Sequence, residues 1–194
     1  MGFSFSAVAV KGGARESVLD AVGLRATGRY EEIPESNITG AVLPSGWFVI
    51  IGNRGDPTFA HEASLLQLSR DFDVLTWFVE EHVMCSSAGS WRGGREVWSV
   101  QHSADQGINN LEVKGELPPN FASIRDGLRA RQQNAGGEKA DVDYIFDIPV
   151  ELIQSITGYR HDKVIPELRE VRFEILARNK ETPQRSWIRR LLGR

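Results

Sequence analysis

The chain has 194 residues, of which 41% are hydrophobic and 25% are charged, and its formal net charge at pH 7 is −3. These values are typical of one soluble globular domain that is large enough to form a hydrophobic core without disulfide bonds or other cross-links. A single cysteine excludes an internal disulfide bond and suits a reducing compartment. No apolar run approaches the ~20 residues of a membrane-spanning helix. No basic residues precede the first apolar stretch, so we expect no signal peptide and a cytoplasmic location.

The charge is divided unevenly along the chain. Residues 178–194 contain six basic residues and one acidic residue, so this tail carries +5 and the rest of the chain carries −8. An acidic body does not attract nucleic acid through its general field, and we expect no specific nucleic-acid partner. An acidic surface suits the capture of a basic protein instead.

Hydrophobic patterns of strand and helix type occur along most of the chain. The clearest strand is GWFVIIGN, because a row of large apolar residues indicates burial on both faces. Strands are expected at residues 3–10, 27–33, 46–53, 73–85, 95–102, 110–116, 142–146 and 171–176, helices at residues 14–24, 62–69, 117–133 and 147–158, and a loop at residues 34–39.

The order of these elements predicts the fold class. Strands occur in neighbouring runs and do not alternate strictly with helices. We therefore expect an α+β fold, with a largely antiparallel mixed sheet of about six or seven strands and helices packed mainly on one face. Residues 1–176 are predicted to form a single domain, divisible into halves at residues 1–71 and 72–176. Residues 177–194 are predicted to form a basic amphipathic tail.

Cys85 and His102 are the first candidate pair. The Gly93-Gly94 step favours a tight hairpin turn, which would place Cys85 opposite His102 on an apolar sheet face. One interpretation is a thiol activated by a neighbouring imidazole, as in nucleophilic cysteine enzymes. The alternative is a small buried thiol beside a histidine at the edge of the sheet, which is the ordinary environment of a free cysteine.

Glu80 and His82 are the second candidate pair. They would share a strand face, where the carboxylate could orient the imidazole for acid–base chemistry. With Ser86 and Gln101 they could serve a small-molecule-binding protein or a hydrolase, provided that the face forms a concave pocket. The alternative is a solvated patch on a half-exposed sheet.

No metal or cofactor site is predicted. The chain has no CxxC or HExxH spacing, and the loop at residues 11–17 lacks the spacing of a phosphate-binding loop. Asp141 and Asp143 could share a strand face and bind a hard divalent cation. Asp147 as a helix cap, with the other two on a solvated edge, explains the same residues without a ligand.

Two further segments could bind a partner. In the loop GYRHD, Arg160 and His161 could recognise an acidic or phosphorylated group, or the loop could simply end a helix. In the tail, a helix would place Trp187 on an apolar stripe beside Arg189 and Arg190, which suits weak docking to a membrane or a partner. The alternative is a helix that packs on its own domain, or a frayed terminus.

Three segments also carry a resemblance: GWFVIIGN, CSSAGSWRGGREVWSVQH and DVDYIFDIPVELIQSITGYRHD. Together they resemble a group of uncharacterised bacterial proteins of about this length. The resemblance covers most of residues 1–165 and leaves the tail outside. It implies a bacterial cytosolic setting, and it transfers no catalytic role to any residue.

Our leading functional hypothesis is a non-enzymatic module that binds another macromolecule, of which an immunity- or accessory-type protein would be one instance. It follows from an acidic, well-patterned domain without a coherent catalytic constellation. The alternative is the small-molecule binder or hydrolase that would use the polar sheet face. The oligomeric state is left open.

Overall fold

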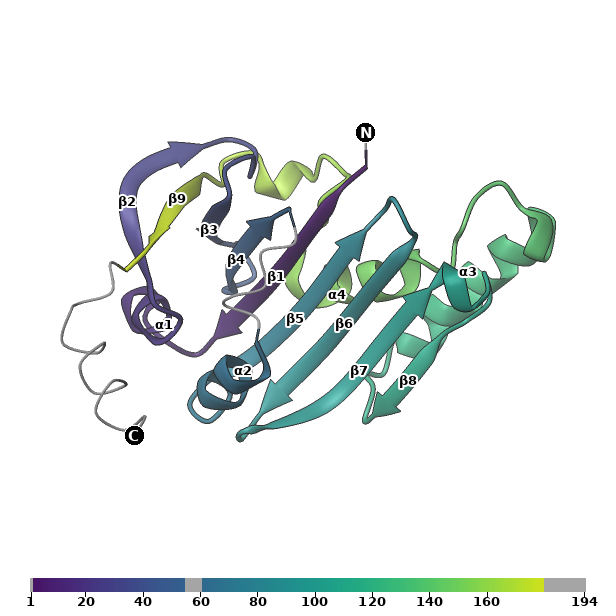
Figure 1. The fold of residues 1–194 in the computed structure, drawn as a ribbon, viewed down its shortest axis with the longest axis horizontal. Helices are drawn as coiled ribbons and strands as arrows, with labels where there is room; N and C mark the ends of the chain where they lie inside the picture. The colour runs from purple at the N-terminus through teal and green to yellow at the C-terminus, as the bar shows by residue number, and fades with distance from the viewer. Residues whose placement is uncertain (1, 55–60, 180–194) are drawn as a thin grey trace, which may run out of the picture.

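The structure is a computed structural model and describes residues 2–54 and 61–179. The described residues form one nine-stranded sheet and four α-helices (Figure 1), which confirms the predicted α+β class with more strands than expected. The strands are β1 (Ser4–Lys11), β2 (Leu24–Glu31), β3 (Ile38–Val42), β4 (Phe48–Asn53), β5 (Asp73–Glu80), β6 (Cys85–Arg92), β7 (Arg95–Ser103), β8 (Glu112–Gly115) and β9 (Phe173–Arg178). Their order across the sheet is β2-β9-β3-β4-β1-β5-β6-β7-β8, and every neighbouring pair is antiparallel.

Two differences explain most of the added strands. β3 occupies part of the predicted loop at residues 34–39, because it pairs with β4 and β9 and all of its residues except Val42 are buried, although they lack a strongly apolar pattern. The predicted single strand at residues 73–85 is interrupted after Glu80 by a turn, in which Met84 adopts a left-handed φ of 48°. The chain reverses there, so β5 and β6 form a hairpin of their own. The strand predicted at residues 142–146 does not form.

The helices cover both faces of the sheet, and the two longer ones share a face. They are α1 (Arg15–Ala21), α2 (Glu62–Leu68), α3 (Phe121–Asn134) and α4 (Asp147–Thr157). Figure 1 shows α4 behind the sheet and α1 and α2 in front of it. None of the helices in the described ranges has the length and apolar character that crossing a membrane requires.

Strand β1 supplies both cores, because its side chains alternate between the two faces. Ala7 and Ala9 pack with the apolar side chains of α3 and α4. Val8 and Val10 pack with those of α1 and α2. Almost every residue of β1 is therefore buried, as expected of a strand in the middle of a sheet covered on both sides.

The hairpin between β6 and β7 contains the predicted Gly93-Gly94 turn, but its register changes after two residue pairs. Arg92 pairs with Arg95, and Ser90 then pairs with Trp98, so Val97 is an extra residue in β7. Such a β-bulge moves every later residue of the strand by one position relative to its partner. The bulge decides which side chains reach each face near the candidate site.

Gly115, at the end of β8, lies close to the backbone of β7. Its φ is +77°, and an added Cβ would lie 2.0 Å from the carbonyl oxygen of Val97. Gly158, which ends α4, has the same φ of +77° but no atom within 4 Å of an added Cβ.

We expect Gly158→Ala to lower the free energy of unfolding by about 1–2 kcal/mol, the usual penalty of a left-handed residue. Gly115→Ala should cost more, because β8 must also move away from β7. Urea unfolding of both variants measures the difference. Equal costs would show that the Val97 carbonyl does not restrict this position.

Candidate functional site

Cys85 and His102 do not meet. Because Val97 is an extra residue, Cys85 pairs with Ser103 and His102 pairs with Ser86. Side chains alternate along each strand, so the thiol and the imidazole point to opposite faces of the sheet. The predicted Cys85–His102 pair is therefore wrong, and its physical reason is the bulge.

Glu80 and His82 are in contact. Nδ1 of His82 lies 2.7 Å from Oε1 of Glu80. The prediction that His82 shares a strand face with Glu80 is wrong, because β5 ends at Glu80 and His82 lies in the turn that follows. The side chain of His82 is 63% exposed. Hydrogen bonds from the side chains of Ser4 and His82 lower the pKa of Glu80, which keeps this group a carboxylate.

The predicted polar face around this pair is not assembled. Ser86 is buried on the face of α3 and α4, where its hydroxyl donates a hydrogen bond of 2.7 Å to the carbonyl oxygen of Phe146. Gln101 lies on the opposite face, in a hollow of about 250 Å³ that Lys114 also lines. Because of this separation, Glu80, His82, Ser86 and Gln101 do not converge on one pocket.

His102 takes part in a different pair, with Asp143. Its ring is completely buried, Nδ1–H donates to the carbonyl oxygen of Asn110 at 2.7 Å, and Nε2–H donates to Oδ2 of Asp143 at 2.8 Å. Burial by itself lowers the pKa of His102, but the hydrogen bonds to Asp143 and Asn110 outweigh it and the net shift is upward. The pair thus joins β7 to the segment that precedes α4 as a buried ion pair.

No side chain caps the N-terminus of α4, so the capping role predicted for Asp147 is not observed, and Asp143 instead binds the backbone of the turn that precedes the helix. Oδ1 of Asp143 accepts hydrogen bonds from the backbone N–H groups of Ile145 and Phe146, at 3.0 and 3.1 Å. Asp147 is the first residue of α4, and its carboxylate faces Arg160. Asp141 and Asp143 share no strand face, because this segment is irregular.

Arg160 lies among three carboxylates. Its side chain is 3% exposed, Nη2 donates to Asp147 Oδ1 at 2.8 Å, and Nε donates to Asp162 Oδ1 at 2.6 Å. Oε1 of Glu151 lies 3.6 Å from Nη1. Burial raises the pKa of Asp147, and Arg160 offsets only part of this effect. The predicted recognition of an acidic group by Arg160 does not fit this geometry, because its guanidinium is already surrounded by carboxylates.

His161 is held between two aromatic rings. Its ring centroid lies 4.9 Å from that of Phe3 and 5.0 Å from that of Phe5. The side chain is 6% exposed, and Nε2 lies 3.5 Å from Oε1 of Glu81. At that distance Nε2 has no hydrogen-bond partner in the described part of the chain. The other oxygen of Glu81, Oε2, accepts the backbone N–H of Phe3 at 2.9 Å.

These groups surround a hollow of about 510 Å³, larger than the hollow on the polar sheet face. We call it the acidic hollow. It lies between the start of β1, the turn from β5 to β6, the segment before α4, and the loop after α4. Its lining residues are Gly2, Glu81, His82, Met84, Asp141, Val142, Asp143, Phe146, Asp147, His161 and Asp162. Five of them are carboxylates, and none of these described residues is a lysine or an arginine.

The carboxylates do not form a metal site. Within residues 2–54 and 61–179, no three His, Cys, Asp or Glu side chains are close enough together to hold a metal ion. The predicted tail residues Trp187, Arg189 and Arg190 lie outside the described residues. Strand β9 extends to Arg178, two residues into the predicted tail.

Sequence reasoning identified some members of the acidic hollow and missed others. Of the two residues predicted in the loop GYRHD, His161 lines the hollow and Arg160 does not. Glu81 was missed because it approaches His161 from 80 residues away in the chain. Asp147 and Glu151 have the i, i+4 spacing that places two side chains on one helix face, and this signal could have shown that α4 presents a pair of carboxylates.

The ion pair between His102 and Asp143 predicts how stability depends on pH. The pKa of His102 is raised in the folded state, so its contribution is fully present below the unfolded pKa of about 6.5 and is lost as the pH rises through the folded pKa. Asp143→Asn should cost about 1.5–3 kcal/mol at pH 6, the usual value for a hydrogen bond to a charged group, and less at pH 9.

Urea unfolding at pH 6 and pH 9 measures this dependence. Asp141→Asn, two residues earlier and exposed, is the matched control and should change stability little at either pH. A cost of Asp143→Asn that is the same at both pH values would contradict a charged His102.

Comparison with known proteins gives no relative from which a function could be transferred. No protein-family model, no curated protein and no solved structure matches the chain. The function must therefore be argued from the acidic hollow itself.

Proposed function

We propose that this protein is a non-enzymatic binding module that recognises a basic region of a partner protein through the acidic hollow. The observation that carries the proposal is the composition of the lining, in which five carboxylates occur without a lysine or an arginine among the described residues. An immunity- or accessory-type role would be one instance of such binding.

The ion pairs around the hollow leave it with an excess of negative charge. The carboxylate of Asp143 is balanced by His102. Asp147, Glu151 and Asp162 share the positive charge of Arg160, and the charge of Lys163 also acts on Asp147. Asp141 is exposed and forms no ion pair with any described residue.

A positive group entering the hollow would therefore be attracted at short range. Carboxylates that are partly removed from water interact more strongly with a cation than fully solvated ones do. Outside the tail the chain carries −8, and this field would guide a basic partner toward the protein before contact.

We expect Glu81→Gln combined with Asp141→Asn to weaken partner binding by about tenfold, the equivalent of 1.4 kcal/mol, because it removes two charges that face the hollow. The full chain, immobilised, is used to recover proteins from cells that naturally produce it. The recovered partner is then purified, and its affinity for the wild type and the variant is measured by titration calorimetry.

The matched control is Glu96→Gln combined with Glu116→Gln, which removes the same charge from exposed positions on β7 and directly after β8. It should leave the affinity nearly unchanged, whereas added salt should weaken binding of the wild type. The proposal fails if gentle conditions recover no stoichiometric partner. It also fails if the two double variants bind the partner equally well.

A further inference from the structure

We propose that the acidic hollow binds a guanidinium group, with the carboxylates of Glu81 and Asp141 and the Nε2 atom of His161 as acceptors. This inference rests on the proposed function and names the group that the partner would insert, the side chain of an exposed arginine. A free guanidinium compound has the same chemistry, and the experiment below separates the two sources.

The first argument is the unpaired nitrogen of His161. The side chain is 6% exposed, and Nε2 faces Oε1 of Glu81 at 3.5 Å without a hydrogen bond. Buried polar atoms are nearly always paired, and an unpaired one indicates a missing partner. Because Glu81 and His161 both line the hollow, a ligand there is in position to provide that partner.

The second argument is that His161 can act as an acceptor. Burial lowers the pKa of His161, and Asp162 and Glu81 offset only part of this effect, so the neutral ring is favoured. In the tautomer with hydrogen on Nδ1, Nε2 has a free lone pair. A ligand that donates hydrogen bonds and carries positive charge would satisfy both the ring and the carboxylates.

The third argument concerns size and shape. No three ligating side chains among the described residues approach one another as a metal ion requires. A volume of about 510 Å³ suits a larger group. Phe146, Met84 and Val142 add apolar surface to the lining, against which a flat, weakly hydrated guanidinium packs better than a strongly hydrated ammonium group.

Arg160 shows how this part of the chain holds such a group. Its guanidinium donates to Asp147 on one side and to Asp162 on the other. Both of these carboxylates also line the hollow. A second guanidinium would thus enter beside the first, facing Glu81 and Asp141, which Arg160 does not contact through any ion pair or hydrogen bond between described residues.

The test is an NMR titration of the ¹⁵N-labelled full chain with N-acetyl-arginine-N-methylamide. We expect saturable shifts of Glu81, Asp141 and the ring nitrogens of His161. N-acetyl-lysine-N-methylamide should bind at least about threefold more weakly, because it lacks the planar fork of donors. Glu81→Gln should weaken the arginine analogue by about fivefold, through loss of a charge-assisted hydrogen bond.

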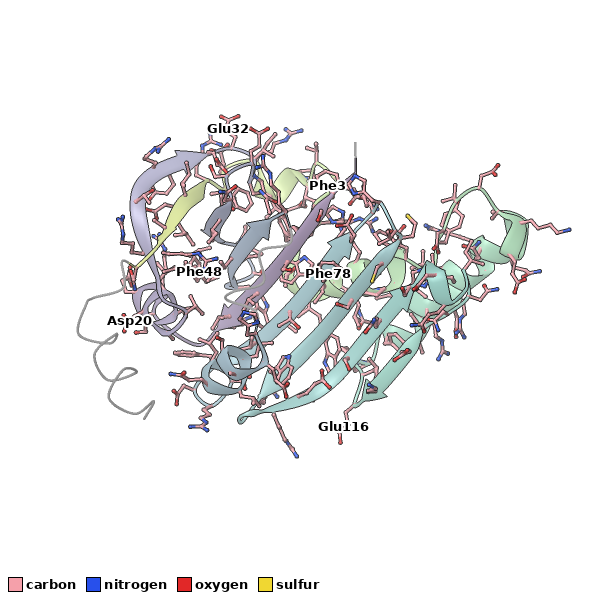
Figure 2. The ribbon with its side chains drawn as sticks, in the orientation of Figure 1. Phe3, Asp20, Glu32, Phe48, Phe78 and Glu116 are labelled. Carbon is pink, nitrogen blue, oxygen red and sulfur yellow. The ribbon has the colours of Figure 1, made fainter. Side chains whose placement is uncertain are left out.

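Two further variants sharpen the test. His161→Phe keeps an aromatic ring between Phe3 and Phe5 but removes Nε2, and it should weaken the arginine analogue. The ring signals of wild-type His161 report on the same contact if that variant does not fold. Glu96→Gln is the matched control and should leave the affinity unchanged. Figure 2 labels Phe3 near the start of β1, and the ring of this residue packs against that of His161.

Each outcome bears on the inference. Equal binding of the two analogues, shifts that do not saturate, or an unchanged His161 signal would overturn it. If the partner requires Glu81 and Asp141 while the arginine analogue does not bind, the inference fails and the proposed function stands. If the analogue binds and no basic partner exists, the inference stands with a free guanidinium compound as the source, and the proposed function fails. If changing one partner arginine to lysine weakens binding, the source is the partner.

Discussion

The buried positive charge of Arg160 is the constraint on which this end of the sheet depends. A guanidinium cannot lose its proton in a protein, so at 3% exposure it requires negative charge beside it. The chain provides this charge from two directions, with Asp147 and Glu151 on α4 and Asp162 in the loop that follows. Three carboxylates carry more negative charge than one guanidinium neutralises, and two of them, Asp147 and Asp162, line the hollow.

The buried pair of His102 and Asp143 stabilises the segment before α4 from the side of β7. His102, on β7, holds Asp143, and Asp143 binds the backbone that leads into α4. The hydroxyl of Ser86, on β6, fastens the same segment through the carbonyl of Phe146. The residues before α4 are therefore fixed to the sheet at several points, although they have no regular secondary structure. Because this segment is already ordered, it loses little conformational freedom when a ligand binds.

Local features of the fold could be predicted from the sequence, and long-range ones could not. The alternation of β1, the apolar run of β4, the Gly93-Gly94 turn and the glycine that ends α4 each depend on neighbouring residues, and each is observed. Strand β3 was missed because its burial comes from strands that lie elsewhere in the chain. Only part of the site was predicted. Arg160 and His161 were expected to recognise an acidic or phosphorylated group. The carboxylates of Asp147 and Glu81 lie beside them instead, and these two residues come near only when the chain folds.

The bulge at Val97 has a consequence for how this surface could evolve. One unpaired residue determines that His102 enters the core while Gln101 and Ser103 face outward. An insertion or deletion of one residue between the turn and Trp98 would exchange the two faces of β7 without altering any side chain. Such an event would expose the partner of Asp143 and bring outward-facing polar groups toward α3 and α4. Which side chains of β7 are buried and which are exposed therefore depends on the number of residues between the turn and Trp98. A change in that number would be harder to tolerate than most substitutions on the exposed face.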